Sequence, residues 1–377
     1  MYWHTRTLYQ NNVITIGQAI KFNLPAHGLM GSLILRFDGI ISAGYGVSGG
    51  DWRIIDKISK IIVQHGSTPI VSVTGLEAHA LAALDQNLIP PDTWRNYNLA
   101  QQWCYCLVNF GRYLNDPEMG LDLGAWDNTQ LIIENTAVLG VDLNSLNVTV
   151  VGIMAEDPAP RQFGGYLSKL EWRSWPTVQN ETIYSLLPEE DVIRRIVLQA
   201  IPPNAAVTFL ATAAMYSEMY NVKLFFDTGR TEVYNDSIEM LMRQNLWNNY
   251  GYWISAVSPY QDADRGFDVG LGYVLGHAHG AGADNDAAAA VIPTWSLGFN
   301  RNTQKKEVSE ANHPDEGLVM GMAPFCCAWI NFDQDLSPLT WLDPRKRASV
   351  TLDIWTRNAA LVAGGRNSII LDLYKPM

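Results

Sequence analysis

A stretch of eight residues occurs twice in the chain in closely similar form. Residues 103–110 are Trp-Cys-Tyr-Cys-Leu-Val-Asn-Phe, and residues 325–332 are Phe-Cys-Cys-Ala-Trp-Ile-Asn-Phe. The first cysteine of each copy and the closing Asn-Phe pair are identical at an offset of 222 residues (326 − 104 = 222). Aromatic and β-branched residues dominate both copies and neither contains Gly or Pro, so each is predicted to form a strand of ordinary length.

Further pairs of similar segments follow the same order in the two halves of the chain. The first of these pairs has a smaller offset of 163 residues (224 − 61 = 163), which implies an insertion of about 59 residues (222 − 163 = 59) in the second half. Two of the segments place a capping oxygen three residues before a Glu, which is typical of a helix N-terminus. Colinear pairs of this kind indicate an internal duplication. The pairs are 61–70 with 224–233, Thr74–Glu77 with Asp236–Glu239, 131–134 with 350–353, and 147–153 with 367–373.

Each half is predicted to contain about eight strands and one helix, at 75–87 in the first half and 237–248 in the second. Strands and helices do not alternate regularly along the chain, as a parallel sheet would require. Eight antiparallel strands in two Greek keys form a jelly roll. We therefore expect an all-β protein with two short flanking helices, built as two tandem eight-stranded jelly rolls. The expected divisions are an N-terminal arm at 1–11, a first roll at 12–160, and a second roll at 161–377 with a long inserted loop at about 250–320.

This organisation resembles the double jelly-roll major capsid proteins of tailless icosahedral viruses, the lineage that joins membrane-containing bacteriophages to adenovirus-like viruses. The passage 104–123 followed by 130–134 is similar to the strand, loop and strand that those proteins carry at this point. The resemblance covers most of the chain as architecture, but only these segments as a sequence pattern.

The resemblance implies a structural protein of the virion and not an enzyme. Such a protein forms a homotrimer, whose six jelly rolls give a pseudo-hexagonal footprint in an icosahedral capsid assembled in the host cytoplasm. The implied partners are further copies of the chain, penton and minor capsid proteins, and an internal lipid membrane reached through residues 1–11. The loop at 250–320 would form an outer tower. The chain departs from some relatives because it lacks a long amphipathic N-terminal helix.

Composition agrees with a packed protein that does not bind nucleic acid through a general basic surface. The net charge is −12 and the sequence pI is about 5.0, which disfavours binding to polyanions. The one compact basic run, Arg345–Arg347, is short enough to be a solvated turn. The four cysteines all lie in the twin segments and are expected to be free, buried thiols. We expect neither a secretory signal nor a membrane-spanning segment.

A two-domain cupin-type metalloenzyme that uses His277 and His279 is the main competing hypothesis. On a strand, this spacing would present both imidazoles on one face. A cupin site also needs a Glu a few residues later, where the sequence has Gly-Ala-Gly-Ala-Asp284. We therefore expect no catalytic, cofactor-binding or metal-binding residues.

Two more hypotheses stay open. A structural Ca²⁺ ion could bind Asp262, Asp264 and Asp268, although the twelfth position of an EF-hand counted from Asp262 is Tyr273 and not Glu. The chain could also be a glycan-binding β-sandwich protein, and only the 13 Trp residues favour that function.

Overall fold

The computed structural model divides the chain into two compact units. The first unit consists of Met1–Leu170 with Tyr374–Met377, and the second consists of Glu171–Leu373. The domain bounds drawn from the sequence, 12–160 and 161–377, stay a prediction. The structure describes residues 2–42, 54–87, 101–126, 128–156, 163–201, 218–248, 253–257, 274–275, 294–295, 317–321, 324–356 and 365–377.

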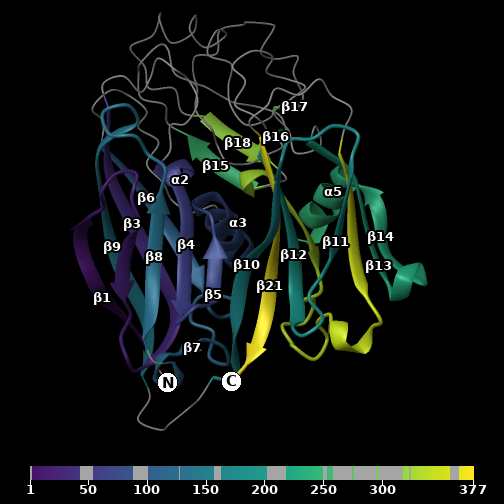
Figure 1. The fold of residues 1–377 in the computed structure, drawn as a ribbon, viewed down its shortest axis with the longest axis horizontal. Helices are drawn as coiled ribbons and strands as arrows, with labels where there is room; N and C mark the ends of the chain where they lie inside the picture. Colours follow the sequence, from purple (N-terminus) through teal and green to yellow (C-terminus); the bar gives the residue numbers. More distant parts are fainter. Residues whose placement is uncertain are drawn as a thin grey trace, which may run out of the picture. The chain divides into compact units, whose positions relative to one another are not determined.

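The first unit contains a five-stranded sheet and four successive strands of an eight-stranded sheet (Figure 1). One has the order β1-β9-β3-β6, with the short β7 beside β3, and the other has the order β5-β4-β8-β2. The strands are β1 (Tyr2–Val13), β2 (Ile20–Asn23), β3 (Leu29–Ile41), β4 (Ile58–His65), β5 (Thr68–Val73), β6 (Gln101–Asn109), β7 (Leu121–Asp122), β8 (Thr129–Asn135) and β9 (Leu143–Glu156). The helices are α2 (Ile54–Lys57), α3 (Gly75–Gln86) and the 3₁₀ turn η1 (Leu123–Ala125).

The same strand order occurs again in the second half of the chain. One array has the order β10-β21-β12-β19, and the other has the order β14-β13-β20-β11. The strands formed by the similar segments therefore take equivalent places in the two orders: β4 and β13, β6 and β19, β8 and β20, and β9 and β21. The strands are β10 (Gly165–Pro176), β11 (Thr182–Leu186), β12 (Val192–Ile201), β13 (Met219–Phe226), β14 (Thr231–Ser237), β19 (Cys327–Asn331), β20 (Val350–Thr356) and β21 (Arg366–Pro376). Helix α5 (Ile238–Asn248) and the 3₁₀ turns η2 (Asp227–Gly229), η3 (Pro324–Cys326) and η4 (Pro344–Lys346) complete this half.

A further sheet lies between α5 and β19 in the sequence. Its order is β15-β18-β16-β17, and its strands are β15 (Trp253–Val257), β16 (Val274–Leu275), β17 (Thr294–Trp295) and β18 (Gly317–Gly321). All four strands fall within or beside the segment 250–320, in which the sequence predicted an insertion.

Alternation of apolar and polar residues builds the core of the first unit. In β3, Leu35 and Phe37 are fully buried and lie between β9 and β6. Phe37 pairs with Cys104 on one side and with Val148 on the other. Neighbouring rows repeat this arrangement, so β-branched and sulfur-containing side chains fill one face of the sheet. The four cysteines are free and buried, as expected from the sequence.

Caps fix the start of both long helices. In α3, the Thr74 hydroxyl accepts a hydrogen bond from the Glu77 amide at 3.2 Å, and the Glu77 carboxylate accepts one from the Thr74 amide at 2.8 Å. This is the predicted capping box. In α5, the cap is Ser237 and not Asp236, because the Ser237 hydroxyl accepts from the Met240 amide at 3.2 Å. The sequence therefore placed this cap one residue too early.

Two further details differ from the sequence prediction. Residues 2–11 do not form a detached arm, because they belong to β1, which pairs with β9 along most of its length. β1 carries irregularities between Thr7 and Tyr9 and between Tyr9 and Asn12. The strand predicted at 324–332 begins only at Cys327, because Phe325 and Cys326 both have positive φ angles, of 52° and 57°. No helix among the described residues is long and apolar enough to span a membrane.

Candidate assembly surface

One face of the array β14-β13-β20-β11 presents large apolar side chains to solvent. Along β11, Ile183 and Ser185 are buried, whereas Tyr184 is 67% exposed and Leu186 is 57% exposed. The inward residues of this array pack into the core of the second roll, where Val222 pairs with Ile354 and Leu224 with Leu352. The outward residues form cross-strand rows. Tyr184, Asp353 and Lys223 make one row, and Leu186, Thr351 and Phe225 make the next.

Strand β10 extends this surface beside β11. The Trp172 indole N–H donates to the Leu186 carbonyl at 3.1 Å, and Trp172 is itself 42% exposed. The Arg173 guanidinium donates to the Tyr184 carbonyl. Exposed aromatic and aliphatic side chains gathered in this way are typical of a surface that binds another protein. We call Trp172, Tyr184, Leu186 and Asp353 the β11 surface.

Asp353 is the charged residue at the centre of the β11 surface. It is only 7% exposed, and its Oδ1 has no hydrogen-bond partner. Burial raises the pKa of this carboxyl, and the nearby Lys223 ammonium offsets only part of that effect. Lys223 itself pairs with Glu232 at 2.8 Å and lies over the Phe225 ring at 5.6 Å. Oδ1 of Asp353 is therefore a buried acceptor without a partner, beneath the exposed side chains of this face.

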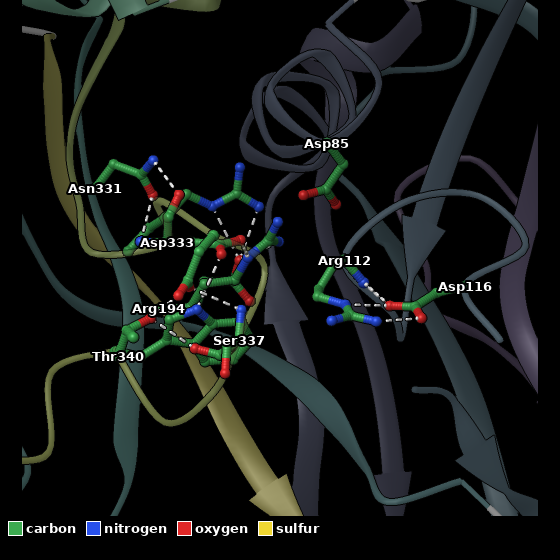
Figure 2. Close-up of polar contacts among 12 residues, drawn as sticks. Asp85, Arg112, Asp116, Arg194, Asn331, Asp333, Ser337 and Thr340 are labelled. Carbon is green, nitrogen blue, oxygen red and sulfur yellow. Dashed lines mark hydrogen bonds and ion pairs between the residues drawn. The ribbon is translucent and has the colours of Figure 1, made fainter. Parts of the chain in front are cut away.

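A buried ion pair orders the loop that follows β6. Arg112 and Asp116 form two parallel hydrogen bonds of 2.7 Å, and Asp116 also accepts from the Arg112 and Glu118 amides at 3.0 Å each (Figure 2). Burial by itself would raise the pKa of Asp116, but these hydrogen bonds outweigh it and hold the pKa below its usual value. A buried charged pair thus holds the centre of this loop.

A second buried network follows β19 in the other roll (Figure 2). Arg194 reaches Asp333 at 2.7 Å and Asp372 at 3.1 Å, and Arg195 reaches the same Asp372 oxygen at 2.8 Å. Consecutive strand residues point to opposite faces of a sheet, so two buried arginines in a row inside a β-strand are unusual. Sequence patterns alone did not single out these residues. The run Ile-Arg-Arg-Ile at 193–196 could have indicated buried ion pairs, because adjacent arginines are unexpected in an otherwise apolar strand.

The metal-ligand candidates His277, His279, Asp262, Asp264 and Asp268 lie outside the described residues. Within the residues that the structure describes, no group of three or more His, Cys, Asp or Glu side chains could hold a metal ion. The basic run Arg345–Arg347 forms part of η4 and its end, where Arg345 pairs with Asp343 at 2.7 Å.

Comparison with solved structures over the full length of the chain agrees with the duplicated strand order. The STIV MCP, from Sulfolobus Turreted Icosahedral Virus, matches with a TM-score of 0.57 and 11% sequence identity, over 99% of this chain and 97% of its own. The PBCV-1 virus capsid matches with a TM-score of 0.57 and 10% identity, over 99% of this chain and 94% of its own. The chain has a double jelly-roll fold. The predicted fold class is confirmed, and so is the resemblance to double jelly-roll major capsid proteins as one of fold.

The similarity to these capsid structures is one of three-dimensional fold and not of sequence. No protein-family model and no curated protein sequence matches the chain. PBCV-1 VP54, solved as fitted into a reconstruction of the virophage Sputnik, matches with a TM-score of 0.56 at 11% identity, over 99% of this chain and 94% of its own. At such identities the shared feature is the arrangement of strands.

Proposed function

We propose that the chain is the major capsid protein of an icosahedral virus and acts by self-association, without catalysing a reaction. The observation that carries this proposal is the duplicated strand order, which matches the STIV and PBCV-1 capsid structures over almost the whole length of both partners. A fold alone does not define function. Here, however, the surface of the second roll supplies a feature that self-association needs.

That feature is the β11 surface. Trp172, Tyr184 and Leu186 expose apolar area on a regular sheet face, which would be costly on an isolated soluble protein and favourable in a contact between subunits. We propose that a second copy of the chain covers this surface in a homotrimer with a pseudo-hexagonal footprint.

Light scattering coupled to size-exclusion chromatography of the purified full chain tests this proposal. We expect one species with three times the mass of the chain, together with shells or hexagonal arrays in electron micrographs. A stable monomer at high concentration would contradict it. A monomer carrying stoichiometric Mn, Fe or Zn would instead favour a cupin-type metalloenzyme, and a monomer retained on a sugar matrix would favour a glycan-binding protein.

The location and the further partners follow from the same proposal. The chain would reside in the virion after assembly in the host cytoplasm, next to penton and minor capsid proteins. An internal membrane would meet outward side chains of β1, such as the exposed Tyr2, and not a detached arm. The segment 250–320 would form the outer tower of the trimer.

A further inference from the structure

A lysine, an asparagine and an aspartate meet in the interior of the first unit. The Lys169 ammonium lies 2.7 Å from Asp85 Oδ2, and the side-chain amide of Asn109 donates to that same oxygen at 3.2 Å. Lys169 comes from β10 and Asn109 ends β6. Asp85 projects from α3 (Figure 2). Three separate elements thus place an amine and a carboxamide on one carboxylate oxygen.

The site is sealed from water. Asn109 is fully buried, and the side chains of Lys169 and Asp85 are 3% and 1% exposed. The 2.7 Å contact between Lys169 Nζ and Asp85 Oδ2 is short enough for direct proton transfer from the amine to the carboxylate. A neutral lysine amine in an apolar site is a strong nucleophile.

The carbonyl of the Asn109 side chain is set up as the electrophile. Its Oδ1 accepts a hydrogen bond of 2.7 Å from the Ser32 hydroxyl, which is also fully buried. A donor aimed at a carbonyl oxygen stabilises the negative charge that develops there during attack. The Asn109 backbone carbonyl accepts from the Lys169 amine at 2.8 Å and so holds the nucleophile beside the residue that it would attack.

We propose that Lys169 and Asn109 form an intramolecular isopeptide bond, catalysed by Asp85. Asp85 first takes a proton from the Lys169 ammonium. The lone pair of Nζ then forms a bond to Cγ of Asn109, and the C=O π electrons move to Oδ1, where Ser32 stabilises them. Asp85 gives its proton to Nδ2 and accepts one from Nζ, the Cγ–Nδ2 bond breaks, and ammonia leaves. The products are a secondary amide, one ammonia and a protonated Asp85, and no oxidant or cofactor is needed.

The arrangement of hydrogen bonds suits this sequence of proton transfers. A single oxygen, Asp85 Oδ2, contacts both the attacking nitrogen and the leaving nitrogen. One carboxyl group can therefore serve as base toward the first and as acid toward the second without moving. The product would tie β10 to the end of β6 through a covalent bond that does not depend on a redox environment.

Intact-mass measurement of the denatured full chain tests the proposal directly. We expect the protein to be lighter than its sequence by the mass of one ammonia. Proteolysis followed by tandem mass spectrometry should yield a branched peptide that joins Lys169 to Asn109. The full sequence mass would overturn the proposal, and so would a loss of ammonia confined to a linear peptide or a loss of water with a branch at Asp85.

Single-residue variants test the separate roles of Lys169, Asn109 and Asp85 in the proposed reaction. Lys169→Arg and Asn109→Ala should each restore the full mass of the variant sequence, and Asp85→Ala should leave most of the chain unlinked. Lys57→Arg is the matched control, because Lys57 also pairs with a largely buried aspartate, Asp142 at 3.2 Å. It should keep the ammonia deficit. Persistence of the deficit in Lys169→Arg would overturn the assignment, and the wild-type mass decides the question even if a variant fails to fold.

Discussion

At the scale of single residues, several charged groups inside the two rolls act as pairs, and Arg112 with Asp116 is the clearest case. The guanidinium of Arg112 and the carboxylate of Asp116 are both almost fully buried, and each supplies the partner that the other needs. Breaking such a pair by removing one member leaves an uncompensated charge in the interior, which costs more than the pair itself contributes.

We therefore expect Asp116→Ala to lower the free energy of unfolding by roughly 3–5 kcal/mol. Replacing both residues, as in Arg112→Met with Asp116→Leu, should cost less than the single change. Urea denaturation followed by tryptophan fluorescence measures both variants. A smaller loss for the single than for the double variant would contradict the paired role.

The pH dependence of this pair follows from the direction of its shift. The folded-state pKa of Asp116 is lowered, so its stabilisation is present above the ordinary aspartate pKa of about 4 and is lost as the pH falls through the lowered folded-state value. The difference in unfolding free energy between wild type and Asp116→Asn should therefore shrink below pH 4.

The pKa of Glu218 is shifted in the opposite direction from that of Asp116. Burial raises its pKa, and the hydrogen bonds from Thr177 at 2.8 Å and Asn367 at 3.3 Å only partly offset this, while its Oε1 has no partner. The ionised form is thus disfavoured in the fold, and stability is lost as the pH rises from the ordinary glutamate pKa of about 4.3 through the raised value.

Glu218→Gln should accordingly stabilise the protein at pH 7 by about 1 kcal/mol, since a neutral amide avoids the cost of a buried charge. Thermal melting of both proteins between pH 4 and pH 8 tests this expectation. The advantage of the variant should fall toward zero at the acid end. An advantage that grows on acidification would exclude this explanation.

At the scale of elements, alternating sequences predicted their strands well. The pattern Leu-Ile-Leu-Arg-Phe at 33–37 identified β3, and the duplicated segments placed β6, β8, β20 and β21 within a few residues. Strand β10 was missed, because Gly164 and Gly165 after a proline-rich stretch suggested a linker, whereas the strand begins at Gly165 itself. The start of β19 was misjudged because positive φ angles at Phe325 and Cys326 leave no signal in residues of that type.

Surface and network residues were harder to predict than strands. The β11 surface depends on which side of a sheet faces solvent. The row of Tyr184, Asp353 and Lys223 forms only because three strands pair side by side. The partners of Lys169, on α3 and β6, are 84 and 60 residues away in the sequence. Pairings of this kind follow from topology, and no local pattern encodes them.

The capping box gives a prediction for a whole element. Thr74→Ala should cost about 1 kcal/mol in unfolding free energy, because it removes the acceptor for the Glu77 amide at the start of α3. Thr74→Ser, which keeps the hydroxyl, is the matched control and should cost much less. Equal losses in the two variants, by chemical denaturation, would point to packing of the threonine methyl group instead of capping.

At the scale of the whole molecule, the β11 surface predicts how assembly should fail. Leu186→Arg should shift the proposed trimer toward monomer by at least tenfold in dissociation constant, because it places a cation on the exposed apolar face. Leu339→Arg is the control, since Leu339 is 91% exposed, lies in the turn between Ser337 and Thr340, and is not part of the β11 surface.

Sedimentation velocity over a range of concentrations compares the two variants. Normal association of Leu186→Arg, with an unchanged far-ultraviolet circular dichroism spectrum, would show that the second copy binds elsewhere. Weakened association in both variants would indicate a general effect of added charge.

The irregular edge of β1 bears on unwanted strand pairing between molecules. β1 is the last strand of its array, and an uninterrupted outer edge would let strands of other molecules add to it without limit. The two register shifts between Thr7 and Asn12 break the regular row of amides and carbonyls along that edge. This edge is therefore a poor template for the strands of other molecules.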